Sequence, residues 1–188
     1  MRKALLNLVV GANGEGKTTF LKRNIIDRNN PHGKKNIIIV TPDPVEHTEY
    51  PLIEEDNNFA KNIYYNEGTK RIIWNDNLPV IVNNCYNCTL ILDDIKTILT
   101  NSTPQFMANL YIRRRQRMVD IYFVSHFLME IPPRAFSFAN YLILFKINEN
   151  INRRKNIIDE NNFEKIAKAK FELDNAKKYS YKIIELLK

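Results

Sequence analysis

A complete phosphate-binding loop stands near the amino end of the chain. Residues 11–18 read GANGEGKT and match the pattern G-x-x-x-x-G-K-[ST], with an apolar run before them and a helical pattern after them. Glycines let successive backbone N–H groups converge on phosphate oxygens, and the helix that follows directs its positive end at them. A chance glycine-rich turn would not explain the full motif in this context. We therefore predict nucleoside triphosphate binding by nine residues: Gly11, Ala12, Asn13, Gly14, Glu15, Gly16, Lys17, Thr18 and Thr19.

Three side chains of this loop have specific expected roles. The Lys17 ammonium should reach the β- and γ-phosphates and so act in catalysis, whereas the Thr18 hydroxyl should ligate Mg²⁺. Thr19, the next residue, should contact the α-phosphate. All three roles concern binding and charge neutralisation, so the loop does not indicate which process the energy drives.

A second acidic motif follows the apolar run LIL at residues 90–92. In proteins with such a loop, Asp93 would lie near the Mg²⁺ shell and Asp94 would polarise the attacking water as a general base. A plain helix N-cap after a strand would use the same residue type. The phosphate loop upstream favours the catalytic interpretation, with Asp93 on the metal and Asp94 as the base.

The densest positive charge, RRRQR at residues 113–117, precedes another apolar run that ends in Ser125-His126. Arginine in this place can reach a γ-phosphate across a subunit boundary or hold a nucleic-acid backbone. We assign the first role to Arg115, which we expect at the start of a strand next to the phosphate loop. His126, at the end of that strand, would sense the γ-phosphate by hydrogen bonding. The other candidates for the arginine role are Arg113, Arg114 and Arg134.

Both assignments have plain alternatives. A basic run is most often the solvated face of a helix, and a lone histidine usually has a structural role. The remaining histidines, His32 and His47, show no metal-ligand spacing and receive no predicted role.

The elements that must position these residues alternate along the chain. Short apolar runs at 4–10, 36–40, 89–92, 121–124 and 141–145 predict buried strands, while 71–74 and 80–82 are weaker strand candidates. Helical spacing occupies 18–26, 103–118 and a tail from 161, and 179–187 could form a final edge strand. This alternation predicts a three-layer α/β fold built on a mainly parallel sheet. We expect a single domain over 1–188, with a core at 4–146 and a C-terminal helix and possible edge strand at 147–188.

Composition excludes several other classes of protein. The 188 residues are 44% hydrophobic and 26% charged, an ordinary globular balance that argues against disorder. A net charge of +7 favours a polyanionic partner. The chain has no apolar stretch of about 18 residues, so we expect no membrane-spanning segment.

The order of the motifs resembles that of the FtsK–HerA superfamily of DNA-pumping ATPases. The resemblance covers residues 4–146 and joins the phosphate loop, an apolar strand ending in two carboxylates, and an arginine eleven residues before the end of the next strand. That strand often ends in Thr-Gln or Ser-Gln in the family, whereas here it ends in Ser125-His126. A bare core of this length is similar to the genome-packaging ATPases of tailless double-stranded-DNA viruses.

The resemblance implies a RecA-like P-loop NTPase fold that uses ATP and Mg²⁺. It further implies a homo-oligomeric ring, a pentamer or hexamer, that moves double-stranded DNA, with a capsid or membrane-vertex protein as a further partner. Its location would be the cytoplasm of the host cell, or the virion. A Zot-like ATPase of virion or filament assembly remains an alternative. A small nucleotide kinase fits less well, because paired carboxylates suit water activation and no lid segment with its own arginines is evident.

Overall fold

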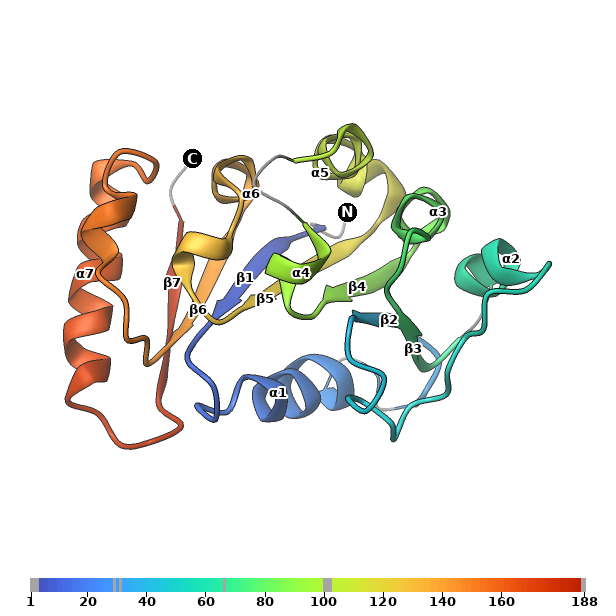
Figure 1. The fold of residues 1–188 in the computed structure, drawn as a ribbon, viewed down its shortest axis with the longest axis horizontal. Coiled ribbons are helices and arrows are strands. Elements are labelled where there is room, and N and C mark those ends of the chain that lie inside the picture. Colours follow the sequence, from blue (N-terminus) through green and yellow to red (C-terminus); the bar gives the residue numbers. More distant parts are fainter. Residues whose placement is uncertain (1–3, 29, 31, 66, 100–102, 187–188) are drawn as a thin grey trace.

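One mixed sheet forms the centre of the chain. The computed structural model describes residues 4–186 apart from 29, 31, 66 and 100–102, and within that part seven strands pair in the order β3-β2-β4-β5-β1-β6-β7 (Figure 1). Every pair is parallel except β6 with β7. The strands are β1 (Leu6–Val10), β2 (Asn36–Thr41), β3 (Thr69–Ile73), β4 (Cys88–Leu92), β5 (Asp120–Ser125), β6 (Tyr141–Phe145) and β7 (Tyr181–Glu185).

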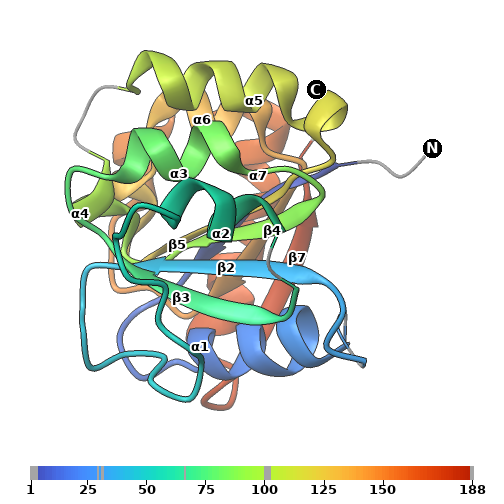
Figure 2. The ribbon, with the colours of Figure 1, turned by 90° about the vertical axis from the view of Figure 1, so that its right-hand side faces the viewer.

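Helices cover both faces of this sheet. In Figure 2, α1 lies below the strands, whereas α2, α3 and α5 lie above them. The helices are α1 (Lys17–Phe20), continued by the π-helical η1 (Leu21–Asp27), α2 (Phe59–Tyr65), α3 (Leu78–Asn84), α4 (Ile95–Ile98), α5 (Gln105–Arg117), α6 (Pro133–Phe138) and α7 (Glu160–Asp174), with 3₁₀ turns η2 (Leu128–Glu130) and η3 (Ile151–Arg154). The expected three-layer α/β fold on a mainly parallel sheet is confirmed.

Alternate residues of each central strand supply two cores. Because successive side chains point to opposite faces, Val9 and Ile39 pack with Phe20 and Leu21 under the sheet. The next residues along the same strands, such as Leu8, pack against the helices above it. Burial on both faces explains why β1, β2 and β4 appear in the sequence as unbroken apolar runs.

The strand expected at 80–82 is wrong, since these residues belong to α3. Pro79 stands in the first turn of that helix, where a missing N–H costs nothing. Leu78, Ile81 and Val82 face the core at helical spacing, whereas Val80 is 40% exposed. A three-residue apolar run has no period of its own, so helix and strand could not be distinguished there.

The strand that comes last in the sequence, β7, forms one edge of the sheet. The edge strand expected at 179–187 is β7, although residue 187 lies outside the described part. It pairs antiparallel with β6, with Tyr181 opposite Phe145. The turn from α7 into β7 therefore lies at the same edge of the sheet as the loop after β1 (Figure 1).

Strand order also decides which loops meet. The parallel strands β1, β2, β4 and β5 all end at one edge, so the segments that follow them converge there. The Gly11 amide donates to the carbonyl of Ser125 at 3.2 Å, and the Asp93 amide donates to that of Val40 at 2.9 Å. This edge brings together most of the residues singled out in the sequence.

Candidate nucleotide-binding site

The loop after β1 has the backbone that its glycines allow. Gly16 has φ = +97°, a left-handed conformation that disfavours any side chain, directly before α1 begins at Lys17. A Cβ at Gly11 would lie 2.5 Å from the Phe145 Cβ. The loop thus packs closely on β6, and the left-handed glycine lets the chain turn directly into α1.

Lys17 lies at the centre of this loop and is only 8% exposed. Its Nζ donates to the carbonyls of Gly11 at 2.6 Å and Ala12 at 3.2 Å, and contacts His126 Nδ1 at 3.1 Å. Burial lowers the pKa of Lys17, although the charges of Asp93, Glu130, Asp94 and Glu46 oppose that effect. The ammonium is therefore held in place by backbone carbonyls at the base of the loop, where it can meet an anion.

A cleft of about 500 Å³ opens over this loop. Its walls come from the loop, the segment after β2, the ends of β4 and β5, and the turn before β7. Nine of the predicted site residues line it: Asn13, Gly14, Gly16, Lys17, Thr18, Thr19, Asp93, Asp94 and His126. Gly11, Ala12 and Glu15 belong to the same loop, and the first two provide the carbonyls that hold Lys17.

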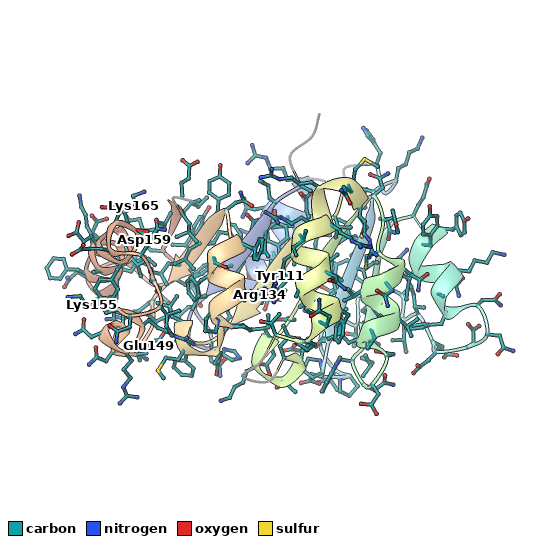
Figure 3. All side chains as sticks on the ribbon, turned by 90° about the horizontal axis from the view of Figure 1, so that it is seen from above. Tyr111, Arg134, Glu149, Lys155, Asp159 and Lys165 are labelled. Carbon is teal, nitrogen blue, oxygen red and sulfur yellow. The ribbon has the colours of Figure 1, made fainter. Side chains whose placement is uncertain are left out.

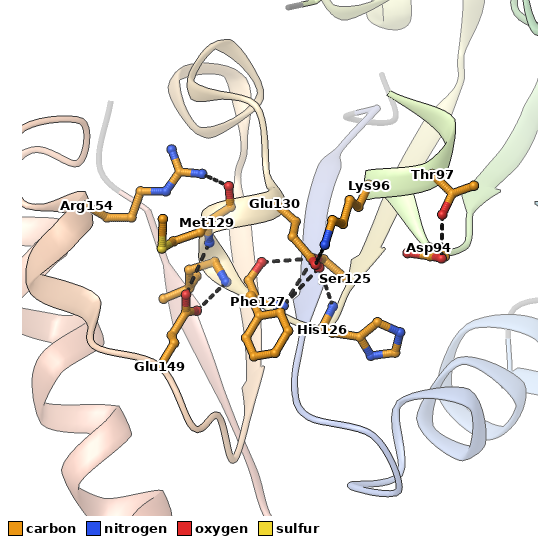
Figure 4. Close-up of polar contacts among 11 residues, drawn as sticks. Asp94, Lys96, Thr97, Ser125, His126, Phe127, Met129, Glu130, Glu149 and Arg154 are labelled. Carbon is orange, nitrogen blue, oxygen red and sulfur yellow. Dashed lines mark hydrogen bonds and ion pairs between the residues drawn. The ribbon is translucent and has the colours of Figure 1, made fainter. Parts of the chain in front are cut away.

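The two carboxylates of the acidic motif have different surroundings. Asp93 is largely buried and its Oδ2 lies 2.7 Å from His47 Nε2. Asp94 occupies the N-cap position of α4 with φ = +49°, but its side chain makes no capping bond to the backbone. Instead its Oδ2 accepts a hydrogen bond from the Thr97 hydroxyl at 2.8 Å (Figure 4). The plain N-cap interpretation of Asp94 therefore lacks its defining contact.

The segment after β2 supplies two groups that the sequence analysis missed. His47 is buried with φ = +56°, and Glu46 lines the cleft beside it. Burial alone would lower the pKa of His47, but the hydrogen bond and charge of Asp93 outweigh it and raise that pKa. Burial, followed by the charge of Asp93, raises the pKa of Glu46. The only signal in the sequence was the position of both residues soon after a buried strand.

Glu130 organises the turn that carries His126. Its Oε2 accepts from the Ser125 hydroxyl at 2.7 Å, from the His126 amide at 3.1 Å and from the Phe127 amide at 3.2 Å, while Lys96 pairs with its other oxygen (Figure 4). Burial opposes its charge, but these bonds prevail and lower the pKa of Glu130. The His126 backbone is thereby fixed beside Lys17.

A second layer of contacts holds that turn from behind. Glu149 accepts from the backbone amides of Leu128 and Met129, and Arg154 donates to the carbonyls of Met129 and Ile131 (Figure 4). Both side chains come from the segment after β6. The C-terminal part of the chain therefore braces the His126 turn.

The placement expected for Arg115 is wrong. Arg115 is exposed in the last turn of α5, before β5 begins, and β5 runs six residues from there to the cleft. Six strand residues span about 20 Å, so within one chain Arg115 does not reach the cleft. Its position leaves open the subunit-boundary role and the nucleic-acid role, but excludes contact with the nucleotide of its own chain.

The alternative arginines differ in their surroundings. Arg114 is 4% exposed and donates to the carbonyls of Tyr111 and Phe138, which assigns it a structural role. Arg134 is exposed on α6 beside Tyr111 (Figure 3). Arg113 is exposed on α5. Arg113 and Arg134 therefore remain available to a partner, whereas Arg114 does not.

The cleft fits a magnesium nucleotide chemically. Among the described residues that line it, four are acidic, namely Asp43, Glu46, Asp93 and Asp94. Carboxylate and hydroxyl oxygens are the ligands that Mg²⁺ prefers, and Thr18 and Asp93 offer one of each in the same cleft. A divalent cation would offset the repulsion between these carboxylates and a polyphosphate, while the loop amides and Lys17 would hold the phosphates.

The sheet order and the phosphate loop give this chain the fold of the RecA-like P-loop NTPase class. Within it, the chain is similar in structure to the genome packaging NTPase B204 from Sulfolobus turreted icosahedral virus 2. The B204 structure with sulfate matches with a TM-score of 0.78 and 14% identity, over 99% of this chain and 93% of that one. The B204 structure with ATP-gammaS gives a TM-score of 0.78 at 14% identity, covering 99% and 94%. The crystal structure of the DNA-packaging ATPase B204 from Sulfolobus turreted icosahedral virus gives 0.75 at 13%, covering 99% and 94%.

Sequence comparison adds nothing to this likeness. No protein-family model matches the chain, and no curated protein matches it in sequence. At 13–14% identity the structural matches establish the fold. In the described part of the chain, none of the helices has the length and apolar character needed to cross a bilayer.

Proposed function

We propose that this protein is an ATPase that moves double-stranded DNA, and specifically that it packages a viral genome. The observation that carries the proposal is the meeting of Lys17, Asp94 and His126 in one cleft over the phosphate loop. The fold shared with B204, described as a genome packaging NTPase, supports the packaging role. The basic charge of +7 supports a DNA partner.

The proposed chemistry divides among the cleft residues. Lys17 and the loop amides bind the phosphates, with Thr19 at the α-phosphate. Thr18 and Asp93 would hold Mg²⁺, which would supply charge neutralisation at the phosphates. Asp94 takes a proton from the attacking water, and His126 contacts the γ-phosphate from the end of β5. Glu130 keeps His126 in place, because it binds the backbone amide of that residue.

Ring assembly is the second part of the proposal. Arg115 lies far from the cleft of its own chain, so it would serve the cleft of a neighbour in a pentamer or hexamer. We assign the whole of 1–188 to one ATPase domain. The ring would act in the host cytoplasm or on the virion, where a capsid or membrane-vertex protein would anchor it.

The test is ATP hydrolysis measured with and without duplex DNA, across a range of protein concentrations. We expect the rate per subunit to rise with protein concentration, since the cleft needs a neighbour, and to rise further with DNA. Lys17→Ala should abolish hydrolysis, while Lys22→Ala, at an exposed lysine of η1 that pairs with Glu49, is the matched control. Hydrolysis that persists in Lys17→Ala would contradict the site.

Two other outcomes would redirect the proposal. A concentration-dependent rate that is indifferent to DNA would favour an ATPase of virion or filament assembly. Phosphate transfer to a nucleoside monophosphate, detected as a diphosphate product, would identify a nucleotide kinase. Either result would overturn the DNA-moving role.

A further inference from the structure

A second hollow adjoins the phosphate cleft. It has a volume of about 360 Å³ and shares Gly16, Thr19 and Tyr179 with that cleft. Thr19 is the residue expected at the α-phosphate, to which the ribose of a nucleotide is attached. The two hollows therefore meet where the ribose of a bound nucleotide would begin. The remaining lining residues are Phe20, Arg23, Asn24, Phe145 and Tyr181.

The floor of this hollow is aromatic. The ring of Tyr181 lies 4.9 Å from that of Phe20 and 5.4 Å from that of Phe145, measured between centroids. The rings of Phe20 and Phe145 are 5.9 Å apart, edge to face. These contacts join α1, β6 and β7, so the aromatic floor forms only where the C-terminal strand returns to the sheet.

Tyr179 forms the wall between the two hollows. It lies in the turn before β7, is 60% exposed, and places its Cδ1 only 3.2 Å from where a Gly16 Cβ would stand. The glycine required by the loop therefore also makes room for this ring. Lys178 Nζ lies 5.1 Å from the ring centroid, which adds positive charge at the same wall.

The backbone at Tyr179 is strained. Its φ is +70°, a conformation that a bulky residue rarely adopts. Such residues persist where the surrounding structure imposes them, and they concentrate at ligand sites. Here the strained backbone places a large, exposed ring over the phosphate loop. An exposed ring contributes little to the stability of the fold.

We propose that the hollow lined by Tyr179 and Tyr181 holds the purine base and ribose of the nucleotide, with the base stacked on Tyr179. The inference rests on the proposed function, since the phosphates must occupy the loop for the base to arrive here. An aromatic ring offers a face to any base, and the two fused rings of a purine cover it most fully. Arg23, which also lines the hollow, carries N–H donors suited to the base edge or the ribose hydroxyls.

The experiment compares ATP with inorganic tripolyphosphate, both with Mg²⁺, by isothermal titration calorimetry. Tripolyphosphate has the phosphates without the base. For Tyr179→Ala we expect the affinity for ATP to fall about tenfold or more, as the loss of one base–aromatic stack predicts, while the affinity for tripolyphosphate stays within about twofold. Tyr179→Phe keeps the ring and should bind ATP as the wild type does. Tyr65→Ala removes another exposed tyrosine, 70% exposed on α2 away from the hollow, and is the matched control.

A second readout does not depend on affinity. In Tyr179→Trp, ATP should quench the new indole fluorescence by stacking and tripolyphosphate should not, with the single native Trp74 giving the background. Unchanged ATP affinity in Tyr179→Ala, or an equal loss for both ligands, would overturn the base site alone. A wild type that binds neither ligand would overturn the proposed function and the base site together.

Discussion

The charged side chains of the cleft determine which ligand it can bind. Lys17 is a buried cation held by backbone carbonyls, and four carboxylates line the same cleft. Among these carboxylates Asp93 contacts His47, and the cleft gathers more carboxylates than lysines among its described lining residues. A magnesium polyphosphate would complement both kinds of group, because it presents anionic oxygens to Lys17 and a cation to the carboxylates.

Asp94→Asn tests which carboxylate acts as the base. The change keeps the shape and the Thr97 contact but removes basicity, so ATP binding should persist while turnover falls by a factor on the order of 10² or more. Turnover and nucleotide binding should be measured on the same preparation. Asp76→Asn, at an exposed aspartate that does not line the cleft, is the matched control and should retain most activity. An Asp94→Asn variant that binds no nucleotide would instead assign Asp94 a metal or structural role.

At the scale of secondary-structure elements, strand β3 contains a buried lysine, Lys70. Lys70 is 3% exposed, and burial lowers the pKa of Lys70 to about 8. An unfolded lysine titrates near 10.5. Between these values the unfolded chain binds more protons than the folded one, so the free energy of unfolding should rise with pH across that window.

Lys70→Met should remove this dependence. The variant has no ammonium to desolvate, so at pH 7 its thermal midpoint should exceed that of the wild type, and the difference should shrink as the pH approaches 10. Thermal unfolding followed by circular dichroism at pH 7, 8, 9 and 10 measures it. Lys61→Met, at an exposed lysine of α2, controls for the loss of a charge as such. A constant difference across this pH range would contradict the assignment.

At the scale of the whole molecule, the role proposed for Arg115 requires a second subunit. Arg115→Ala should lower turnover by about 10³-fold or more and leave ATP affinity within a few-fold, as for an arginine supplied in trans. Mixing this variant with Lys17→Ala creates interfaces that join an intact loop to an intact arginine, so activity should partly return. Turnover is assayed across mixing ratios, after subunit exchange has been demonstrated with labelled protein. Exchange without recovery would transfer the role to Arg113 or Arg134.

DNA binding should be an electrostatic property of the whole surface. With a net charge of +7, we expect affinity for duplex DNA that is independent of base sequence and falls steeply with salt. Fluorescence anisotropy with two duplexes of unrelated sequence, titrated between about 50 and 200 mM salt, measures both properties. Affinity indifferent to salt, or restricted to one sequence, would argue against a DNA-moving motor.

The sequence by itself determined the phosphate loop, the strands that end in the acidic motif and in His126, and the parallel α/β class. These features are local. The residues of the loop motif determine the backbone conformation of the loop, and a strand buried on both faces is an apolar run whichever strands it pairs with. The single-domain assignment and the roles of the site residues remain predictions.

Only the tertiary structure decided which distant residues share the cleft. His47 lies 46 residues from Asp93 in sequence and hydrogen-bonds to it because β2 pairs with β4. Tyr179 reaches Gly16 because β7 returns beside β6, and Arg115 is held away from the cleft because its helix ends before β5 begins. Strand order is set by the packing of the whole sheet, so no spacing in the sequence encodes these neighbours.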